Sequence, residues 1–455
     1  MFPVTDVSRL FFGHSAHAEG NRVFADYERD IRIESSVLPD GTVTTCVPGT
    51  AIFEEQDSLL NLSPNREIKR QLYRVLTKVT EKQFPWGSLT GIRPTQIARE
   101  LRDTETMIRY YDVRRDKAFL AIQTAEAEDR ILNTTNRDDL FVYIGIPFCP
   151  GRCAYCSFTT QENRSGNVPL NDYLDHVLHE IKILSPLFRN VRAVYIGGGT
   201  PTMMDEERLE SFIGSCLQMI CPDRSTEITV EAGRPDTLTG KKSEILASLG
   251  VKRTCVNPQS LSDATLTRIG RNHSSGQFLD AFRSVREAGI RNINTDVIAG
   301  LPGESEAEFR HTVDSILELS PENITIHALC KKRTADISRE TVLDGIERVR
   351  SADAMVSYAL SRLESSGYFP YYLYKQKDTI GGLENTGFSK KGSECLYNVA
   401  MMSDSRNVLA FGAGGVSKRL LSDQRLVRYD RVRNPGEYIR RIEEIIEGKR
   451  RFFEV

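Results

Sequence analysis

Residues 141–156 read Phe141-Val142-Tyr143-Ile144-Gly145-Ile146-Pro147-Phe148-Cys149-Pro150-Gly151-Arg152-Cys153-Ala154-Tyr155-Cys156. The first part of this stretch is apolar and predicts a buried strand, and the second part predicts a loop that carries three cysteines. Further strand-sized apolar runs follow, separated by longer amphipathic segments. The predicted strands are Phe141–Ile146, Ala193–Ile196, Glu227–Glu231, Val251–Val256, Asn292–Ile298 and Asn323–His327. Short strands that alternate with helices are typical of a parallel α/β sheet or barrel.

The predicted fold class is therefore α/β, with an open, partial (βα)6 barrel at its centre. Six strand–helix units are fewer than the eight that close a barrel. In such folds the chemistry lies in the loops that follow the C-terminal ends of the strands. Each chemically suggestive segment of this sequence occupies such a position, which supports the fold independently of any motif.

The segment before the barrel predicts a small α+β N-terminal domain, residues 1–135. A hairpin is expected near residues 32–47, around a Pro-Asp-Gly turn, and residues 64–135 have helical periodicity. Trp86 and the following run Thr90–Thr95 could form a functional loop. We interpret Trp86 as a packing anchor and the run as the start of a helix.

We place the barrel core at residues 138–335 and a C-terminal cap region at 336–455. The cap is expected to begin with a long helix at about 340–366, to continue as an irregular, Gly-rich region, and to end in a charged helix near 434–448. No long linker precedes it in the sequence, so we expect it to pack on the barrel.

Composition excludes several classes of protein. Among 455 residues, Lys+Arg 60 and Asp+Glu 62 leave a net charge of −2, so a strongly basic nucleic-acid binder is not predicted. No apolar run reaches ~18 residues, which argues against a membrane span. Acidic Asp6 lies where a secretory signal needs basic residues, and nine cysteines, an odd number, argue against a disulfide framework. We expect a cytoplasmic protein.

The thiol loop has the spacing C-x3-C-x2-C and comprises Cys149, Cys153 and Cys156. Three thiolates fit three corners of a [4Fe–4S] cluster, which normally takes four cysteines, so one iron is left open for an outside ligand. Structural zinc is the alternative, but it needs four closed ligands, and no Cys or His follows at finger spacing. Buried thiols without a metal are the remaining alternative.

The second predicted strand ends in Gly197-Gly198-Gly199-Thr200-Pro201. Glycines allow close approach to the backbone, so we expect this loop to offer N–H and C=O groups to the amino group of a methionine moiety bound at the open iron. A tight turn or a phosphate loop remains an alternative, although the Lys of a P-loop is missing.

Polar residues recur at the later strand ends, namely Glu231, Gln259, Arg271 and Asp296. A carboxylate inside an apolar barrel strand is costly unless it is paired or hydrogen-bonded. Arg271 and Asp296 at one cavity suit a zwitterionic ligand with ribose hydroxyls. For each of these residues, a structural ion pair at the barrel mouth is the alternative.

With these residues in view, the sequence resembles the radical S-adenosylmethionine (SAM) superfamily, and within it the oxygen-independent coproporphyrinogen III oxidase (coproporphyrinogen dehydrogenase) family. Family landmarks occur in order over about residues 138–420, at Tyr143–Cys149, Gly197–Pro201, Val256–Ser260 and Gly300–Gly303. The runs Trp86–Thr95, Leu383–Asn385 and Glu394–Asn398 resemble a branch with an extra N-terminal domain.

The resemblance implies that Cys149, Cys153 and Cys156 bind the [4Fe–4S] cluster. It places Tyr143, Gly198 and Glu231 around the SAM molecule on the open iron, with Tyr143 as the catalytic candidate. Positions that contact a second SAM in the oxidase correspond to Tyr155, Gly199, Thr200, Gln259, Arg271 and Asp296.

The implied activity is haem biosynthesis without oxygen. A 5′-deoxyadenosyl radical would take a hydrogen atom from a substrate propionate, and loss of carbon dioxide and one electron would leave a vinyl group. Two rounds would convert coproporphyrinogen III into protoporphyrinogen IX. The expected partners are the porphyrinogen substrate and an external electron donor and acceptor, with no nucleic acid.

Two departures from the family concern the reacting centre. The well-characterised oxidases carry a His where this chain has Gly145, and a fourth Cys just beyond the cluster is replaced by Ser157 and Phe158. Glu394–Asn398 and Gly412–Gly414 also resemble the family's haem-chaperone branch, which does not decarboxylate coproporphyrinogen. A haem-binding chaperone and a radical-SAM methyltransferase acting on haem therefore stay as alternatives.

A tetracarboxylate macrocycle needs cationic partners. Lys331, Lys332 and Arg333 follow the sixth predicted strand on the mouth side of the barrel, and Lys390 and Lys391 lie in the C-terminal region. We expect these residues to be candidates for binding propionates, with solvated surface charge as the alternative.

Overall fold

The computed structural model describes residues 2–20, 22–56, 62–91, 93–156, 161–162, 168–330, 346–423, 425–429 and 432–454. Its centre is a run of parallel strands: β6 (Leu140–Ile146), β9 (Val191–Gly198), β10 (Glu227–Glu231), β11 (Arg253–Cys255), β12 (Asn292–Ala299) and β13 (Asn323–Ala328). These are the six predicted strands, each within two residues of its expected ends. The predicted α/β class and the partial (βα)6 barrel are confirmed.

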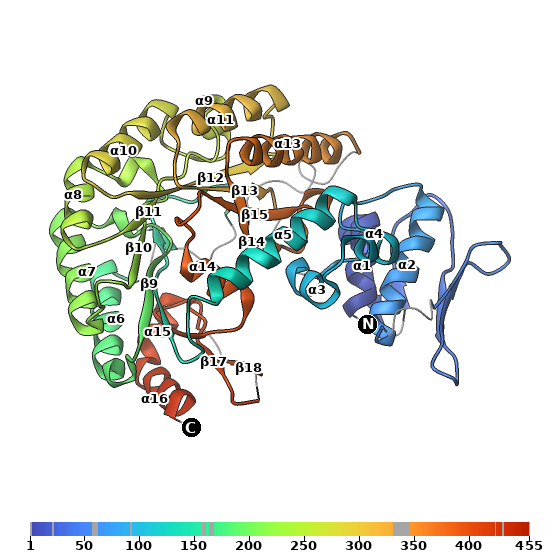
Figure 1. The fold of residues 1–455 in the computed structure, drawn as a ribbon, viewed down its shortest axis with the longest axis horizontal. Coiled ribbons are helices and arrows are strands. Elements are labelled where there is room, and N and C mark those ends of the chain that lie inside the picture. The colour runs from blue at the N-terminus through green and yellow to red at the C-terminus, as the bar shows by residue number, and fades with distance from the viewer. Residues whose placement is uncertain are drawn as a thin grey trace.

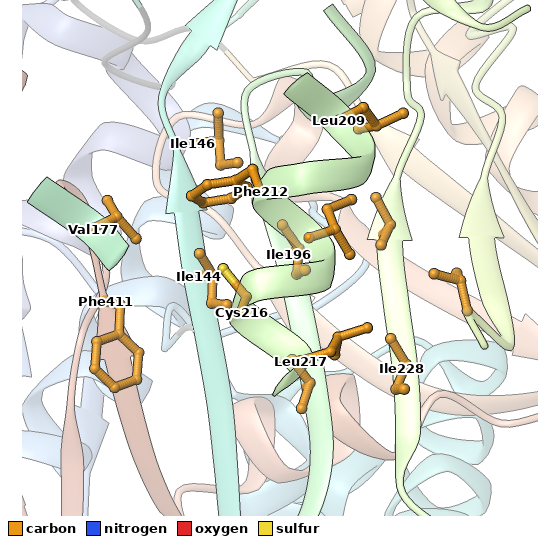
Figure 2. Close-up of a cluster of buried hydrophobic side chains, with 14 of the residues drawn as sticks. Ile144, Ile146, Val177, Ile196, Leu209, Phe212, Cys216, Leu217, Ile228 and Phe411 are labelled. Atoms are coloured by element: carbon orange, nitrogen blue, oxygen red, sulfur yellow. The ribbon is translucent and has the colours of Figure 1, made fainter. Parts of the chain in front are cut away.

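Amphipathic helices cover the outer face of these strands, as Figure 1 shows. They are α6 (Leu170–Leu184), α7 (Glu206–Ile220), α8 (Gly240–Ser248), α9 (Asp263–Arg268), α10 (Ser275–Glu287) and α11 (Glu306–Leu319). Figure 2 shows Phe212 and Cys216 of α7 packed toward Ile144 of β6 and Ile196 of β9. This buried apolar layer fixes the strand ends that carry the polar side chains. Within the described ranges, no helix combines the length and the apolar character that crossing a bilayer requires.

The C-terminal region does more than cap the barrel, because it extends the sheet at both edges. On one side, β14 (Phe369–Lys375) and β15 (Glu384–Ser389) continue it, with β15 antiparallel to β13. On the other, β16 (Asn407–Phe411) lies parallel to β6 and is followed by β17 (Lys418–Leu420) and β18 (Leu426–Arg428). The resulting order is β14-β15-β13-β12-β11-β10-β9-β6-β16-β17-β18. An open barrel leaves unpaired backbone groups at its edge strands, and these added strands satisfy them.

The region expected to be irregular therefore contains regular strands, which corrects the sequence-based description. Helices complete it: α13 (Ile346–Ser365), α14 (Leu396–Ser403), α15 (Pro435–Arg440) and α16 (Ile442–Glu454). The long helix ends where expected, while its predicted start at about residue 340 lies outside the described residues. The region packs on the barrel by strand pairing. The domain boundaries at 135/138 and 335/336 stay predictions.

The N-terminal segment forms the expected mixture of strands and helices beside the barrel (Figure 1). Its elements are α1 (Phe2–Phe12), β1 (His17–Glu19), β2 (Arg22–Phe24), β3 (Glu34–Val37), β4 (Val43–Cys46), β5 (Phe53–Glu55), α2 (Pro64–Thr80), α3 (Pro94–Leu101), α4 (Thr104–Tyr111) and α5 (Arg115–Leu132). The predicted hairpin is β3–β4. Trp86 is buried and donates its indole N–H to Glu384 Oε2 at 2.7 Å. Its role as a packing anchor is confirmed, and Pro94 begins α3 as expected.

Candidate active site

A cavity of about 1050 Å³ lies at the carboxyl ends of the barrel strands. Each residue that the sequence analysis assigned to the cluster or to SAM lines it: Tyr143, Cys149, Cys153, Tyr155, Cys156, Gly198, Gly199, Thr200, Glu231, Gln259, Arg271 and Asp296. Parallel strands bring their carboxyl ends to one edge of the sheet, so residues spread over more than 150 positions meet in one space. The fold brings these residues together.

The thiol loop follows β6 directly and begins at the short strand β7 (Phe148–Cys149). The Sγ of Cys149 lies 3.4 Å from the hydroxyl of Thr200, and the Sγ of Cys153 accepts a hydrogen bond from Nη1 of Arg234 at 3.3 Å. Burial raises the pKa of the Cys149 thiol, the hydrogen bond with Thr200 lowers it, the neighbouring Cys156 and Cys153 raise it, and the resulting pKa is about 11. Such a thiol needs a metal or a cation to become a thiolate.

The donor set fits an iron–sulfur cluster. Soft thiolates are the ligands that such clusters take, and the Arg234 guanidinium supplies positive charge beside Cys153. In the part of the chain that the structure describes, no three His, Cys, Asp or Glu side chains converge on the position of a single ion. A cubane does not require convergence, since each of three irons takes one cysteine sulfur. The loop Cys149–Cys156 can therefore hold a [4Fe–4S] cluster with one iron left open.

The glycine loop packs tightly against the strand end that leads to Cys149. The N–H of Gly199 donates to the carbonyl of Ile146 at 2.9 Å, and the N–H of Thr200 donates to the carbonyl of Phe148 at 2.7 Å. A Cβ on Gly199 would lie 2.3 Å from the Phe148 oxygen, so only glycine fits. This corrects the expectation that these N–H groups are open to a ligand. An ammonium group is a donor, so the carbonyl oxygens of the loop are its candidate partners.

Glu231 joins the glycine loop to a stack of tyrosines. Its carboxylate accepts hydrogen bonds from the Gly198 N–H at 3.0 Å and from the Tyr195 hydroxyl at 2.5 Å. Burial raises the pKa of Glu231 above its usual range. The rings of Tyr143, Tyr195 and Tyr397 stack with centroids 4.6 to 6.2 Å apart. Burial also raises the pKa of Tyr143, so its phenol stays protonated.

Asp296 is held in a polar network on β12. Its carboxylate accepts from the side-chain amides of Asn257 at 2.8 Å and Asn294 at 2.7 Å, and its Oδ2 lies 3.6 Å from Nε2 of His327. Burial raises the pKa of Asp296, but His327 and the hydrogen-bond donors outweigh it, so the net pKa is below the usual range. Asp296 is therefore an ionised acceptor that faces the cavity.

Arg271 and Gln259 complete the predicted set. Arg271 donates to the Tyr155 hydroxyl at 3.2 Å and to the carbonyl of Gly233 at 2.9 Å. Within the described residues, Arg271 and Asp296 do not pair with each other, whereas Asp296 lies within ion-pair distance of His327. Gln259 has a φ of 65°, a strained conformation for a side-chain-bearing residue, and its buried Oε1 lacks a hydrogen-bond partner within the described chain. Both features are typical of a ligand-binding position.

Several residues at the site were missed from the sequence. Arg234 comes three positions after Glu231, and a cation just beyond a strand end was a usable signal. His327 is the last residue but one of β13, and Asn385 on β15 lies 3.1 Å from its Nδ1. Asn385 and Tyr397 belong to C-terminal elements. No pattern in the sequence around them indicates that these elements lie beside the barrel.

The structure also explains the departure at Gly145. A Cβ there would lie 3.0 Å from the backbone oxygen of Ala413 and 3.2 Å from the Tyr143 ring. Ala413 follows β16, which pairs with β6, so the backbone after β16 crowds a side chain at position 145.

The cations that were predicted to bind propionates are a separate case from the residues assigned to the cluster and to SAM. Lys390 donates to the Ser320 carbonyl at 2.7 Å, at the opposite end of β13, and neither Lys390 nor Lys391 lines the cavity. For this pair the alternative of surface charge is right, because the turn after β15 lies at the amino end of the barrel strands. Lys331, Lys332 and Arg333 lie outside the described residues.

Comparisons with known proteins agree with the fold. The Radical SAM superfamily model matches residues 143–316. The oxygen-independent coproporphyrinogen-III oxidase-like protein HemZ of Bacillus subtilis (strain 168) is 30% identical over 484 residues, which cover 99% of this chain and 95% of that protein. Heme chaperone HemW of the same organism is 30% identical over 278 residues, 60% of this chain and 69% of that protein. The solved structure of coproporphyrinogen III oxidase (HemN) from Escherichia coli shares the fold, with a TM-score of 0.54 and 19% identity over 72% of this chain and 73% of that chain.

The partial barrel and its three-cysteine loop define a radical SAM protein. Within that superfamily, the chain belongs to the HemN-like family that includes HemZ and HemW. Its cofactors are a [4Fe–4S] cluster and SAM. A cytoplasmic location and the absence of a nucleic-acid partner stay predictions.

Proposed function

We propose that the protein catalyses the oxygen-independent oxidative decarboxylation of two propionates of coproporphyrinogen III, which gives protoporphyrinogen IX in haem biosynthesis. The observation that carries the proposal is that one cavity contains the three thiols, the carboxylates Glu231 and Asp296, and a set of cations. The full-length similarity to an oxidase-like relative supports it.

The reaction balances for each propionate as follows. When bound, the reduced cluster and SAM supply a 5′-deoxyadenosyl radical, which removes a hydrogen atom from the propionate β-carbon. The bond to the carboxylate then breaks, carbon dioxide leaves, and one electron passes to an external acceptor. The remaining two carbons form the vinyl group.

We assign the SAM on the open iron to Tyr143, Gly198 and Glu231. In this assignment, Glu231 fixes the position of Gly198 through the 3.0 Å hydrogen bond, and the loop carbonyls accept from the ammonium group of SAM. Tyr143, a neutral buried phenol, packs beside Gly198 and is the catalytic candidate.

We assign a second SAM-binding region to Tyr155, Gly199, Thr200, Gln259, Arg271 and Asp296. Asp296 is an ionised acceptor and suits ribose hydroxyls. Arg271 suits the carboxylate of SAM. The unpartnered Oε1 of Gln259 offers one more acceptor.

A haem-binding chaperone is the second candidate. The crowded space at Gly145 favours it, since the characterised oxidases carry a histidine at that position. The similarity to HemW, over 60% of this chain, also favours it.

Anaerobic turnover tests the proposal. Protein reconstituted with iron and sulfide is reduced with dithionite in the presence of SAM, coproporphyrinogen III and an electron acceptor, and the products are analysed by mass spectrometry. We expect release of carbon dioxide and a divinyl product. Stable haem binding without decarboxylation would identify the chaperone, and methylated haem would identify a methyltransferase. The Asp296→Asn variant is expected to weaken SAM binding about tenfold, whereas unchanged SAM affinity would make Asp296 a structural partner.

A further inference from the structure

Three cations meet one carboxylate at a part of the cavity wall that the proposed chemistry does not use. Arg93, Lys418 and Arg428 all line the cavity, and all contact Asp404. Nη1 of Arg93 and Nη2 of Arg428 bind Oδ2 of Asp404, and Nζ of Lys418 lies 2.8 Å from Oδ1. We call these four residues the Asp404 cluster.

The Asp404 cluster is assembled from distant parts of the chain. Arg93 precedes α3 in the N-terminal segment, and Asp404 follows the last residue of α14. Lys418 and Arg428 belong to β17 and β18, where they are direct cross-strand partners. Like charges directly opposite each other on antiparallel strands repel, so this register is unfavourable for a purely structural hairpin.

The cluster has a surplus of positive charge. Three cations face one carboxylate, and within the described residues no second carboxylate lies within ion-pair distance of any of the three. The side chain of Lys418 is 4% exposed and that of Asp404 is 10% exposed. Burial lowers the pKa of Lys418, and Arg93 and Arg428 lower it further, against the effect of Asp404. An incoming anion would relieve this repulsion.

The surroundings indicate the size and character of that anion. Met401, Met402 and Tyr397 line the same cavity, and the Lys418 ammonium also donates to the Met401 carbonyl at 2.7 Å. Thioether and aromatic side chains suit the face of a large apolar ring. A cavity of about 1050 Å³ lies at the upper end of the range for ligand sites. A flat, largely apolar ligand with carboxylates at its rim fits this combination.

The other cations at the cavity are already engaged near the thiol loop. Arg234 pairs with Asp236 at 3.1 Å and contacts Cys153, while Arg271 contacts Tyr155. Arg93, Lys418 and Arg428 contact neither the thiol loop nor the glycine loop in the described structure. The cluster is therefore separate from the positions assigned to SAM.

We infer that Arg93, Lys418 and Arg428 form a carboxylate-binding subsite that holds propionates of a tetrapyrrole which are not being decarboxylated. This inference rests on the proposed function, because it takes the tetrapyrrole from it. In this inference the N-terminal segment takes part in substrate binding through Arg93. The β17–β18 hairpin takes part through Lys418 and Arg428.

Binding of coproporphyrin III, the stable oxidised form of the substrate, tests the inference with full-length reconstituted protein. The dissociation constant is measured from the change in porphyrin absorption during an anaerobic titration. We expect Arg93→Gln, whose side chain is 21% exposed, to weaken binding about tenfold, and the half-exposed Arg428→Gln to weaken it about threefold. Each variant leaves Asp404 with two cations, so folding is expected to survive.

Two further variants serve as controls. Arg425→Gln removes an exposed arginine from the same hairpin, where it pairs with Asp423 outside the cavity, and its affinity for coproporphyrin III is expected to equal that of wild type. Arg93→Lys keeps the charge and is expected to recover most of the affinity that Arg93→Gln loses.

The outcomes separate the subsite from the proposed function. Wild-type protein that binds coproporphyrin III, with unchanged affinity in Arg93→Gln and Arg428→Gln, would overturn the subsite and leave the proposed function standing. Wild-type protein that does not bind the porphyrin at all would overturn both. Graded loss in the two variants, with Arg425→Gln unaffected, would support the subsite even if turnover assays showed no decarboxylation.

Discussion

His327 and Asp296 form a 3.6 Å pair across the neighbouring parallel strands β12 and β13, with both side chains facing the cavity. Asn385 holds the other ring nitrogen of His327 at 3.1 Å. Burial lowers the pKa of His327, but the hydrogen bond and the charge of Asp296 outweigh it, so the net pKa is above 6.5. The pair connects an expected SAM-binding residue to a histidine that the sequence did not single out.

The His327→Gln variant is expected to show a pH-dependent loss of stability. A histidine whose pKa is raised on folding contributes stability that is fully present below its unfolded pKa of about 6.5 and is lost as pH rises through the folded pKa. We therefore expect the variant to be less stable than wild type by about 1 kcal/mol at pH 5.5, and the difference to shrink above pH 7. Urea unfolding at a series of pH values measures it. His311→Gln, on the exposed surface of α11, is the control, and a difference that is constant with pH would refute the pairing.

The Gly199→Ala variant is expected to disturb both folding and cluster assembly. The added Cβ would lie 2.3 Å from the Phe148 oxygen, and backbone cannot yield as a flexible side chain can. We expect a loss of about 1–3 kcal/mol in unfolding free energy. Because Phe148 precedes Cys149, we also expect less iron per protein after reconstitution. Gly240→Ala, where a Cβ meets open space at the start of α8, should stay within about 0.5 kcal/mol of wild type. Normal stability and iron content in Gly199→Ala would contradict the tight loop.

The Cys153→Ala variant is expected to fold and to lose its cluster. Arg234 loses the sulfur contact but keeps Asp236 at 3.1 Å and the carbonyl of Gly151 at 3.3 Å, so the loop retains its anchor. We expect 5′-deoxyadenosine formation to fall at least 100-fold, with a circular dichroism melting curve close to that of wild type. Cys221→Ser changes an exposed thiol away from the cavity and is the matched control. Full 5′-deoxyadenosine formation in Cys153→Ala would remove Cys153 from the cluster ligands.

The Trp86→Phe variant is expected to weaken the contact between the N-terminal segment and the barrel. It removes the 2.7 Å hydrogen bond to Glu384 Oε2 and leaves Lys117 on Oε1 at 2.6 Å. Loss of one donor to a buried carboxylate costs about 1–3 kcal/mol. A double-mutant cycle with Glu384→Gln, followed by urea unfolding, should give a coupling energy of about 1 kcal/mol or more. Additive effects would show that the two side chains act independently.

Most of the barrel could be predicted from local sequence. Runs such as Asn292–Ile298 have strand composition, and the helices between them have an apolar face, so the elements are specified by residues close together in the chain. The candidate site followed from the same reasoning, because Glu231 ends its strand and Asp296 is a carboxylate inside an otherwise mostly apolar strand. The rule that parallel strands gather these ends at one edge then placed them in one cavity.

The C-terminal strands were not predicted because they form mainly by pairing with the open edges of the barrel sheet. Phe369–Lys375 is rich in aromatic residues but is interrupted by Pro370, and β16 becomes a strand by pairing with β6. The reason for Gly145 depends on the same pairing, since the Ala413 oxygen fills the space beside it. An edge strand pairs with a segment that is hundreds of residues away in the chain, and the periodicity of a short stretch of sequence does not predict such a pairing.

The sequence by itself determined the chemistry of the centre: three thiols on one short loop after a buried strand, in a chain whose strands and helices alternate. Only the tertiary structure decided which side chains surround that centre. In the folded chain His327 contacts Asp296 and Asn385. Arg93 joins Lys418 and Arg428 around Asp404, although more than 300 residues separate Arg93 from Asp404. The spacing of the three cysteine ligands is fixed by residues that are close together in the chain. Which charges pair and which side chains line the cavity depends instead on how distant segments pack against each other.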